Sequence, residues 1–132
     1  MSLVHLIYAS RPFGYDELSL AGILASARAN NQRDGITGCL ICREDLYLQQ
    51  LEGDQAAVKT AYERIARDPR HTEVSLLLSD TAPTRLFPDW AMRHDPAKSW
   101  LWTSAAVADG AVRRASIAEL QAVFARVARE AT

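Results

Sequence analysis

Long hydrophobic runs are absent from this sequence of 132 residues. No apolar stretch approaches the roughly 20 residues that a membrane-spanning helix needs. The apolar segment at residues 3–9 is too short for the core of a signal peptide, and no basic residues precede it. We therefore expect a cytoplasmic protein that has no membrane partner.

Cysteine is scarce, and neither sign of charge is in excess. Two cysteines do not form a disulfide scaffold, which favours a reducing compartment. Lys plus Arg is 15 and Asp plus Glu is 16, so the net charge is −1. Such a chain has no strong field to attract nucleic acid. A hydrophobic fraction of 48% and a charged fraction of 23% indicate one soluble globular domain.

Motifs for nucleotide binding and for hydrolysis are also missing. The sequence contains no G-x-G-x-x-G, no Walker loop and no G-x-S-x-G. Cys39 and Cys42 form a C-x-x-C, but it falls in a predicted strand, where positions three apart point to opposite faces. No second C-x-x-C completes a zinc site, and the three histidines have no ligand spacing. We expect two core cysteines and no metal.

Apolar patterning predicts the element order βαββαββ. The predicted strands cover residues 3–9, 36–42, 46–52, 74–80 and 90–94. The predicted helices cover about residues 19–31 and 55–67, with Ser19 and Asp54 as N-caps. The second and third strands form a hairpin around a charged turn. Two helices on one face of a mixed sheet give an α+β class of the ferredoxin-like type.

Residues 96–132 are predicted to form a C-terminal helical extension of a compact domain at residues 1–95. The final helix begins at about Ser116, where Ser116 and Glu119 match a capping box. Its apolar stripe consists of Ile117, Leu120, Phe124 and Val127. Because this helix is strongly amphipathic, we expect it to pack on the sheet face away from the first two helices and to contribute to self-association.

Three polar side chains fall on predicted apolar faces. They are Asn31 in the last turn of the first helix, Gln49 in the third strand and Tyr8 in the first strand. Each also fits an ordinary role: Asn31 as a helix C-cap, Gln49 as an edge-strand residue that reaches water, and Tyr8 as a core tyrosine. Taken together, three buried hydrogen-bonding groups suggest a polar ligand such as a planar heterocycle.

Six short segments, in this order and spacing, resemble the BLUF family of flavin-based blue-light sensors over about residues 2–95. The segments are YAS at 8–10, NN at 30–31, ITG at 36–38, LQQLEG at 48–53, DPRH at 68–71 and FPDWAM at 87–92. The resemblance implies a ferredoxin-like fold with a flavin held between the two helices. It implies a photoreceptor and not an enzyme, with FAD as the usual cofactor and FMN or riboflavin as alternatives.

The resemblance also implies roles for single residues. Tyr8 is expected to give an electron and a proton to the excited flavin. Gln49 is expected to switch its hydrogen bonds between Tyr8 and the N5/O4 edge of the ring, and Asn31 to hold the ring through O4 and N3. The other cofactor-binding positions that the resemblance implies are Ile23, Asn30, Ile65, Asp68, Arg70 and His71.

The implied output is a red-shifted signalling state passed to an unidentified downstream protein. We expect the signal to travel through the predicted fifth strand, in which Trp90 and Met92 share a face and either one can lie near Gln49. The 37 residues after Asp95 are too few for an enzyme domain, so we expect a short, stand-alone receptor. We also expect a homo-oligomer, because the second sheet face needs a cover.

Two other interpretations stay open. One is a small ferredoxin-like hydrolase of the acylphosphatase type that uses Arg11 with Asn31, although residues 11–14 make a poor phosphate loop. The second is an interaction module without a cofactor. A purified protein that is yellow, and stays yellow through dialysis and gel filtration, would separate the photoreceptor from both.

Overall fold

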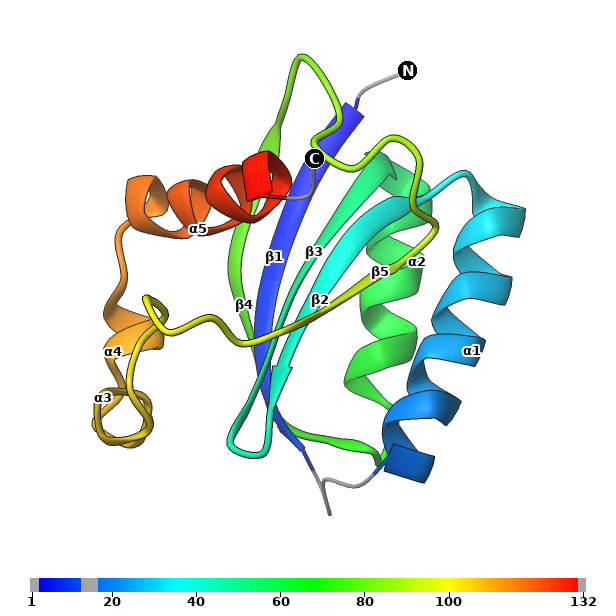
Figure 1. Cartoon of the computed structure of the whole chain (residues 1–132). Coiled ribbons are helices and arrows are strands. Elements are labelled where there is room, and N and C mark those ends of the chain that lie inside the picture. Colours follow the sequence, from blue (N-terminus) through cyan, green and yellow to red (C-terminus); the bar gives the residue numbers. More distant parts are fainter. Residues whose placement is uncertain (1–2, 13–16, 131–132) are drawn as a thin grey trace.

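A computed structural model of the chain, which describes residues 3–12 and 17–130, contains a five-stranded mixed sheet with helices on both faces (Figure 1). The strands are β1 (Leu3–Pro12), β2 (Thr37–Arg43), β3 (Leu46–Asp54), β4 (His71–Thr81) and β5 (Arg93–Pro96). The helices are α1 (Glu17–Asp34), α2 (Gln55–Ala66), α3 (Ser104–Ala108), α4 (Ala111–Arg114) and α5 (Ile117–Glu130). The predicted α+β class is confirmed.

Strand β1 lies inside the sheet, whose strand order is β4-β1-β3-β2-β5. It pairs antiparallel with β3 on one side and with β4 on the other. The hairpin of β2 and β3 forms as predicted, and β5 runs parallel to β2 at the edge. This pairing places Tyr8 directly opposite Gln49, although the two residues are 41 positions apart.

Each face of the sheet has its own hydrophobic core. The first lies under α1 and α2, and its buried members include Val4, Leu6, Ile23, Leu40, Leu51 and Val58. The second lies under α5, and its buried members include Ile7, Ile41, Leu48, Leu120, Phe124 and Val127. Cys42 belongs to the first core and Cys39 to the second, so the two cysteines point to opposite faces as predicted.

Two predicted helix starts have different outcomes. Asp54 caps α2 as predicted, because its carboxylate accepts the Ala56 N–H at 3.2 Å. Ser19 is not an N-cap, since α1 begins at Glu17. The first turn of α1 is exposed, with Leu18 at 85%, so it adds nothing to the apolar stripe from which the start was predicted. Residues 13–16, in the segment considered as a phosphate loop, lie outside the described residues.

The fourth and fifth strands also differ from their predicted ranges. Strand β4 begins at His71, three residues earlier than expected. Strand β5 begins at Arg93, so Trp90 and Met92 lie before the strand and not in it. The backbone carbonyls of Ala91 and Met92 accept hydrogen bonds from side chains of α1, and the Trp90 carbonyl oxygen accepts the Gly38 N–H of β2 at 3.1 Å, so the chain meets β2 irregularly before β5 begins.

The C-terminal region follows the predicted pattern with one exception. The capping box forms, since Glu119 N–H donates to Ser116 Oγ at 3.1 Å and Ser116 N–H donates to Glu119 Oε1 at 3.0 Å. Helix α5 buries Leu120, Phe124 and Val127, together with Val123, on the sheet face away from α1 and α2. Ile117 is 55% exposed and lies outside the buried stripe, because it stands in the first turn. No described helix is long and apolar enough to cross a membrane.

Phe124→Ala tests how much α5 stabilises the sheet. The ring is fully buried and packs edge-on against Phe87, with 6.4 Å between the centroids. We expect the substitution to lower the free energy of unfolding by about 3–5 kcal/mol in a urea titration. The exposed neighbour Gln121→Ala is the control and should change it by less than about 0.5 kcal/mol. Equal losses in the two variants would contradict the packing assigned to α5.

Candidate functional site

A cavity of about 180 Å³ opens between α1, α2 and the sheet. Its apolar walls come from both helices and from β3, and its polar groups come from β1, β3 and the two helix ends. Every cofactor-binding residue expected from the sequence lines it: Tyr8, Ile23, Asn30, Asn31, Gln49, Ile65, Asp68, Arg70 and His71. Residues from five segments of the chain, namely β1, α1, β3, α2 and residues 68–71, therefore converge on one cavity.

Arg11 and Asn31, the residues of the hydrolase interpretation, do not line the same cavity. Arg11 lines a different cavity, of about 340 Å³, between the sheet and α3–α4, and it pairs with Glu73 at 3.7 Å. Asn31 is not among the residues of that cavity. Arg11 and Asn31 therefore do not form a joint phosphate site. Within residues 3–12 and 17–130, no three His, Cys, Asp or Glu side chains are grouped as metal ligands.

Two residues that line the cavity, Tyr8 and Gln49, form a chain of buried side chains with Met92, which lies outside the cavity lining. The Tyr8 hydroxyl donates a hydrogen bond to Gln49 Oε1. Gln49 Nε2 in turn donates to Met92 Sδ at 3.1 Å. Both ends of the Gln49 amide are thus engaged, with its oxygen toward Tyr8 and its nitrogen toward Met92. A rotation of the amide would break both contacts at once.

Trp90 and Met92 do not share a face, contrary to the sequence prediction. Met92 is 1% exposed and lies against Gln49, whereas Trp90 is 48% exposed. The prediction assumed strand geometry, in which side chains two positions apart point the same way. Because both residues precede β5, that alternation does not apply to them.

The amides at the end of α1 present unpaired atoms to the cavity. Asn31 Nδ2 donates to the Ala91 carbonyl oxygen at 2.8 Å, so its side chain does not cap its own helix. Among the described residues, none forms a hydrogen bond with Asn31 Oδ1 or with the side-chain amide of Asn30. Asn31 is buried, and a buried amide oxygen normally has a hydrogen-bond partner. This geometry favours a ligand with a donor group at that point.

Charged groups stand at the end of α2. The Asp68 carboxylate accepts from the Arg70 backbone N–H at 2.9 Å and from Arg70 Nη2 at 2.6 Å. These hydrogen bonds hold the pKa of Asp68 below its ordinary value. His71 is buried beside them, with Nδ1 2.7 Å from Ser10 Oγ, and burial lowers its pKa to about 4. Burial also raises the pKa of the Tyr8 phenol well above its usual value, so at neutral pH Tyr8 is protonated and His71 is uncharged.

Five residues that line the cavity were not predicted from the sequence as site residues. Ala27 and Ala61 lie one helical turn from Ile23 and Ile65 on the same stripes, and the i, i+4 spacing pointed to them. Leu51 alternates with Gln49 on β3. Ser26 and Arg64 lie beside the apolar stripes, and nothing in the hydrophobic pattern marked them.

Comparison with known proteins decides the identity of the fold. A family model described as "BLUF: Sensors of blue-light using FAD" matches residues 3–93. The chain belongs to the BLUF family. This BLUF domain is a flavin-binding blue-light photoreceptor module, as the resemblance implied. Helices α3–α5 lie beyond the residues that the family model matches.

Relatives and solved structures agree with that assignment. Photoactivated adenylate cyclase subunit beta of Euglena gracilis is 35% identical over 92 residues, which is 69% of this chain and 10% of that protein. The chain therefore spans about a tenth of the length of such curated relatives. The dark-state structure of the BLUF protein BlrB is 31% identical with a TM-score of 0.79, and the match covers 98% of this chain and 97% of that one.

A third comparison concerns a flavin-containing structure. Klebsiella pneumoniae BlrP1 with FMN and cyclic diGMP is 30% identical to this chain, with a TM-score of 0.67. The match covers 81% of this chain and 29% of that one. The family description thus names FAD, while this structure holds FMN.

The buried, uncharged His71 predicts a pH dependence of stability. Its pKa falls from 6.5 in the unfolded chain to about 4 in the folded one, so the unfolded state binds more protons between these values. The free energy of unfolding should therefore drop as the pH falls from 6.5 to 4, by at most about 3 kcal/mol. The lowered pKa of Asp68 changes the free energy of unfolding only below the ordinary Asp pKa of 3.8, which lies outside the pH range from 6.5 to 4.

Urea titrations of the wild type and of His71→Gln at several pH values from 7 to 4 measure this effect. Gln keeps a polar group near Ser10 but does not titrate. The variant should show a flatter pH profile than the wild type in this window. Parallel profiles for the two proteins would contradict the assignment of a neutral, buried His71.

Proposed function

We propose that this BLUF domain holds FAD non-covalently in the cavity between α1 and α2, and that blue light changes the hydrogen bonds of Gln49. The observation that carries the proposal is the continuous contact from Tyr8 and Gln49, which line the cavity, to Met92 beyond it. This chain joins a redox-active phenol, an amide with a donor end and an acceptor end, and a segment that can move.

The cavity residues fit a flavin. Ile23 and Ile65 stand on the two helices and provide apolar walls for a flat ring. The unpaired oxygen of Asn31 and the free amide of Asn30 can bind the polar edge of that ring. Gln49 Nε2 carries a second hydrogen beyond the one directed to Met92, and it can donate this hydrogen to the ring.

Tyr8 is the proposed electron and proton donor. The bound flavin supplies the chromophore, and after excitation it is an oxidant strong enough to take an electron and a proton from a phenol. Tyr8 is fully buried and keeps its proton, because burial raises its pKa. Its hydroxyl already donates to Gln49 Oε1. A phenol that loses an electron becomes a strong acid, so the Tyr8 proton leaves along this hydrogen bond.

Gln49 is the proposed switch, and Met92 passes its state onward. When the Gln49 amide turns, its nitrogen leaves Met92 Sδ and the contact that holds residue 92 is lost. A hydrogen bond of this kind contributes on the order of 1 kcal/mol, so it can only shift a segment that is already near balance. We propose that residues 88–96 respond, and that exposed Trp90 lies where a downstream protein can detect the response.

Tyr8→Phe separates the photochemistry from flavin binding. Phe fills nearly the same space but has no hydroxyl and is much harder to oxidise. The purified variant should be yellow and should show no red shift in a light-minus-dark absorption spectrum. Tyr62→Phe is the matched control, because its ring lies 5.8 Å from that of Tyr8 and is only partly buried. A normal red shift in Tyr8→Phe, or its loss in Tyr62→Phe, would remove Tyr8 from the proposed role.

Positive charge at the cavity favours a phosphorylated flavin over riboflavin, and the family description names FAD. Arg64 lines the cavity and has only a distant acidic partner, Asp34, at 3.9 Å, whereas Arg70 is paired closely with Asp68. Chromatography of the flavin released by acid should therefore identify FAD. Arg64→Gln should retain FAD about fivefold less well, as expected for one partly exposed charged contact of about 1 kcal/mol. Arg67→Gln, exposed at the end of the same helix, is the control. FMN or riboflavin as the bound species, or equal retention in the two variants, would refute this assignment.

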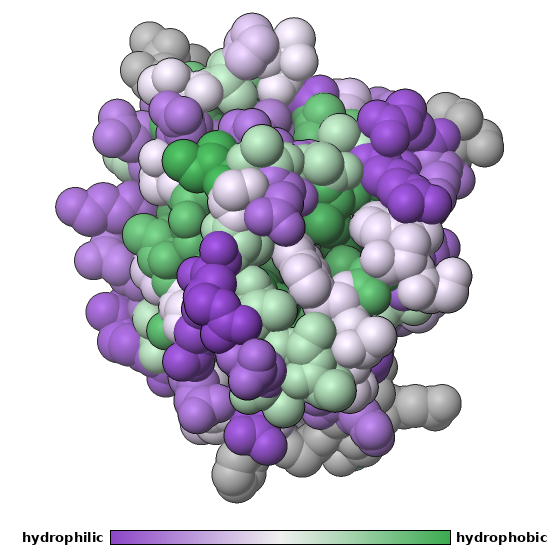
Figure 2. All heavy atoms as spheres, turned by 90° about the vertical axis from the view of Figure 1, so that its left-hand side faces the viewer, coloured by the Kyte–Doolittle hydropathy of each residue, from purple (hydrophilic) through white to green (hydrophobic). Residues whose placement is uncertain are grey.

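We further propose a cytoplasmic homo-oligomer that acts on an unidentified partner protein. Figure 2 shows hydrophobic side chains gathered on the face that carries α3, α4 and α5. Leu76 of β4 and Ile117 of α5 are exposed, and Trp100 and Trp102, in the connection between β5 and α3, are partly buried against the core under α5. A second copy of the chain can cover them. Light scattering that gives the mass of a single chain would contradict the oligomer.

A further inference from the structure

An open groove of about 680 Å³ adjoins the flavin cavity, and Asn31 lines both of them. The walls of the groove come from the last turns of α1, from the residues that lead into β2, and from the connection between β4 and β5. The proposed photochemistry does not use this groove. Its charged side chains are Arg28, Arg85 and Asp89, and its aromatic side chain is Trp90. Arginine and tryptophan are the residue types that contribute most to binding at protein interfaces.

One wall of the groove is segment 88–92, which precedes β5. Its backbone is held by hydrogen bonds to three successive carbonyl oxygens. Trp90 accepts from the Gly38 N–H at 3.1 Å, Ala91 accepts from Asn31 Nδ2 at 2.8 Å, and Met92 accepts from Arg28 Nε at 3.1 Å. The donors belong to β2 and α1, which form the opposite wall. The groove therefore has a defined shape before a ligand binds, which lowers the entropy cost of binding.

Arg28 provides the first positive charge of the groove. Its side chain is exposed, and only its Nε is engaged, by the Met92 carbonyl oxygen. Neither Nη group forms a hydrogen bond or an ion pair with a described residue. Both Nη groups are therefore available to a carboxylate, which a guanidinium binds through parallel N–H groups.

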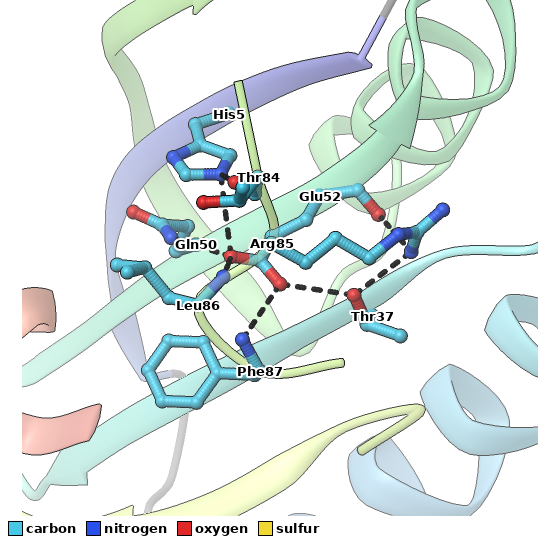
Figure 3. A network of polar contacts seen from close by, with 8 residues as sticks. All are labelled: His5, Thr37, Gln50, Glu52, Thr84, Arg85, Leu86 and Phe87. Atoms are coloured by element: carbon cyan, nitrogen blue, oxygen red, sulfur yellow. Dashed lines mark hydrogen bonds and ion pairs between the residues drawn. The ribbon is translucent and has the colours of Figure 1, made fainter. Parts of the chain in front are cut away.

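Arg85 provides the second positive charge, and its hydrogen bonds go to neutral acceptors. Nη1 donates to Thr37 Oγ1 at 2.9 Å and to the Glu52 backbone carbonyl oxygen at 3.2 Å, and Nη2 donates to the Gly35 carbonyl oxygen at 2.9 Å (Figure 3). The Glu52 carboxylate is fully buried outside the groove lining, where it accepts the Thr37 hydroxyl and two backbone N–H groups. No described carboxylate forms an ion pair with Arg85. Its Nε and the second Nη2 hydrogen stay available to a ligand.

Trp90 and Asp89 decide which class of acidic ligand fits. Trp90 is 48% exposed and adds an apolar surface to a groove that holds two guanidinium groups. Asp89 is exposed and forms no hydrogen bond or ion pair with a described residue. Its carboxylate repels a continuous phosphate backbone, and the net charge of −1 gives the chain no field that attracts nucleic acid. A peptide with a few carboxylates and an apolar side chain fits better.

We propose that this groove binds an acidic segment of the downstream protein. Carboxylates of that segment bind Arg28 and Arg85, and one of its apolar side chains covers Trp90. The inference rests on the proposed function, because the light signal enters through Met92: Gln49 holds the Met92 side chain, and Arg28 holds the Met92 carbonyl oxygen. The two states of Gln49 therefore bind the segment with different affinities, by no more than about one hydrogen bond.

A selection of random peptides displayed on phage, made in the dark on the immobilised, flavin-loaded full chain, tests the inference. The selected peptides should contain more Asp and Glu than the unselected library, together with an apolar residue. Added salt should weaken their binding, because the contacts with arginine are partly exposed. A selection without enrichment of acidic residues overturns the proposal. An oligonucleotide of thymidines that binds the chain and displaces the peptide overturns it as well.

Substitutions in the groove locate the binding of a selected peptide. Arg28→Gln and Arg85→Gln should each weaken it by about two- to fivefold, as expected for one partly exposed charged contact. Trp90→Ala should weaken it by about tenfold. Arg33→Gln is the matched control, because Arg33 is exposed on the same helix, pairs with Asp34 at 2.9 Å and does not line the groove. If Arg85→Gln fails to fold, Arg28→Gln at its exposed position still gives the answer. Unchanged binding in Arg28→Gln, or an equal loss in Arg33→Gln, overturns the proposal.

Illumination tests the link between the groove and the flavin cavity. Under blue light the affinity for the selected peptide should change by about two- to fivefold, and Tyr8→Phe should abolish this change but keep the dark affinity. Equal affinities in the dark and in the light, in a protein with a normal red shift, overturn the proposal, and so does a change that persists in Tyr8→Phe. Failure of the proposed function gives a different result: the protein lacks flavin or the red shift, while the peptide still binds in the dark and Arg28→Gln still weakens that binding.

Discussion

Strands β1 and β3 pair so that Tyr8 stands opposite Gln49, and the chemistry of the site depends on this register. A slip of one residue would turn every side chain of one strand to the opposite face. Tyr8 would then point toward α5 and lose both Gln49 and the cavity. The register is strongly fixed because both strands are buried on both faces, with Ile7 and Leu48 in one core and Leu6 and Leu51 in the other.

Strand β3 connects the two faces of the sheet in one short segment. Gln49 contacts Tyr8 and Met92 on the cavity side, and Glu52 contacts residues 86 and 87 on the other side. Both sets of contacts end on the same stretch of chain between β4 and β5. The strand itself is central and rigid, so a change at Gln49 does not need to move it. In the proposed function the response is instead directed to the segment between β4 and β5.

The sequence predicted the cavity well because its walls follow helical periodicity. Ile23 and Ile65 stood on apolar stripes, and Asn31 interrupted one of them. The roles of Tyr8, Gln49, Asp68, Arg70 and His71 came from the family resemblance, and these five residues line the cavity. Periodicity carries no information about irregular backbone, however. The prediction therefore failed at Trp90 and Met92, whose placement depends on hydrogen bonds from Asn31 and Arg28 that lie some 60 residues away in sequence.

The network around Glu52 was also invisible in the sequence. A strand that reads LYLQQLE suggests an alternation of apolar and polar positions in which Gln50 and Glu52 reach water. In the folded chain both are buried, because the loop at residues 84–87 covers them and supplies backbone donors. Backbone N–H groups exist at every residue except proline, so no residue type marks the place where two of them meet a carboxylate.

The two bonds of Gln49 differ in strength, and this difference suits a switch. Its oxygen accepts from a phenol, which is a good donor, whereas its nitrogen donates to a thioether sulfur, which is a weak acceptor. A backbone carbonyl at the place of Met92 Sδ would hold the amide much more firmly. The weak contact is the one with Met92, through which the proposed signal leaves the site. The strong contact is the one with Tyr8, the proposed redox partner. An amide held in this way can turn when Tyr8 changes its protonation, and the end of segment 88–92 is the first part of the chain to lose a contact.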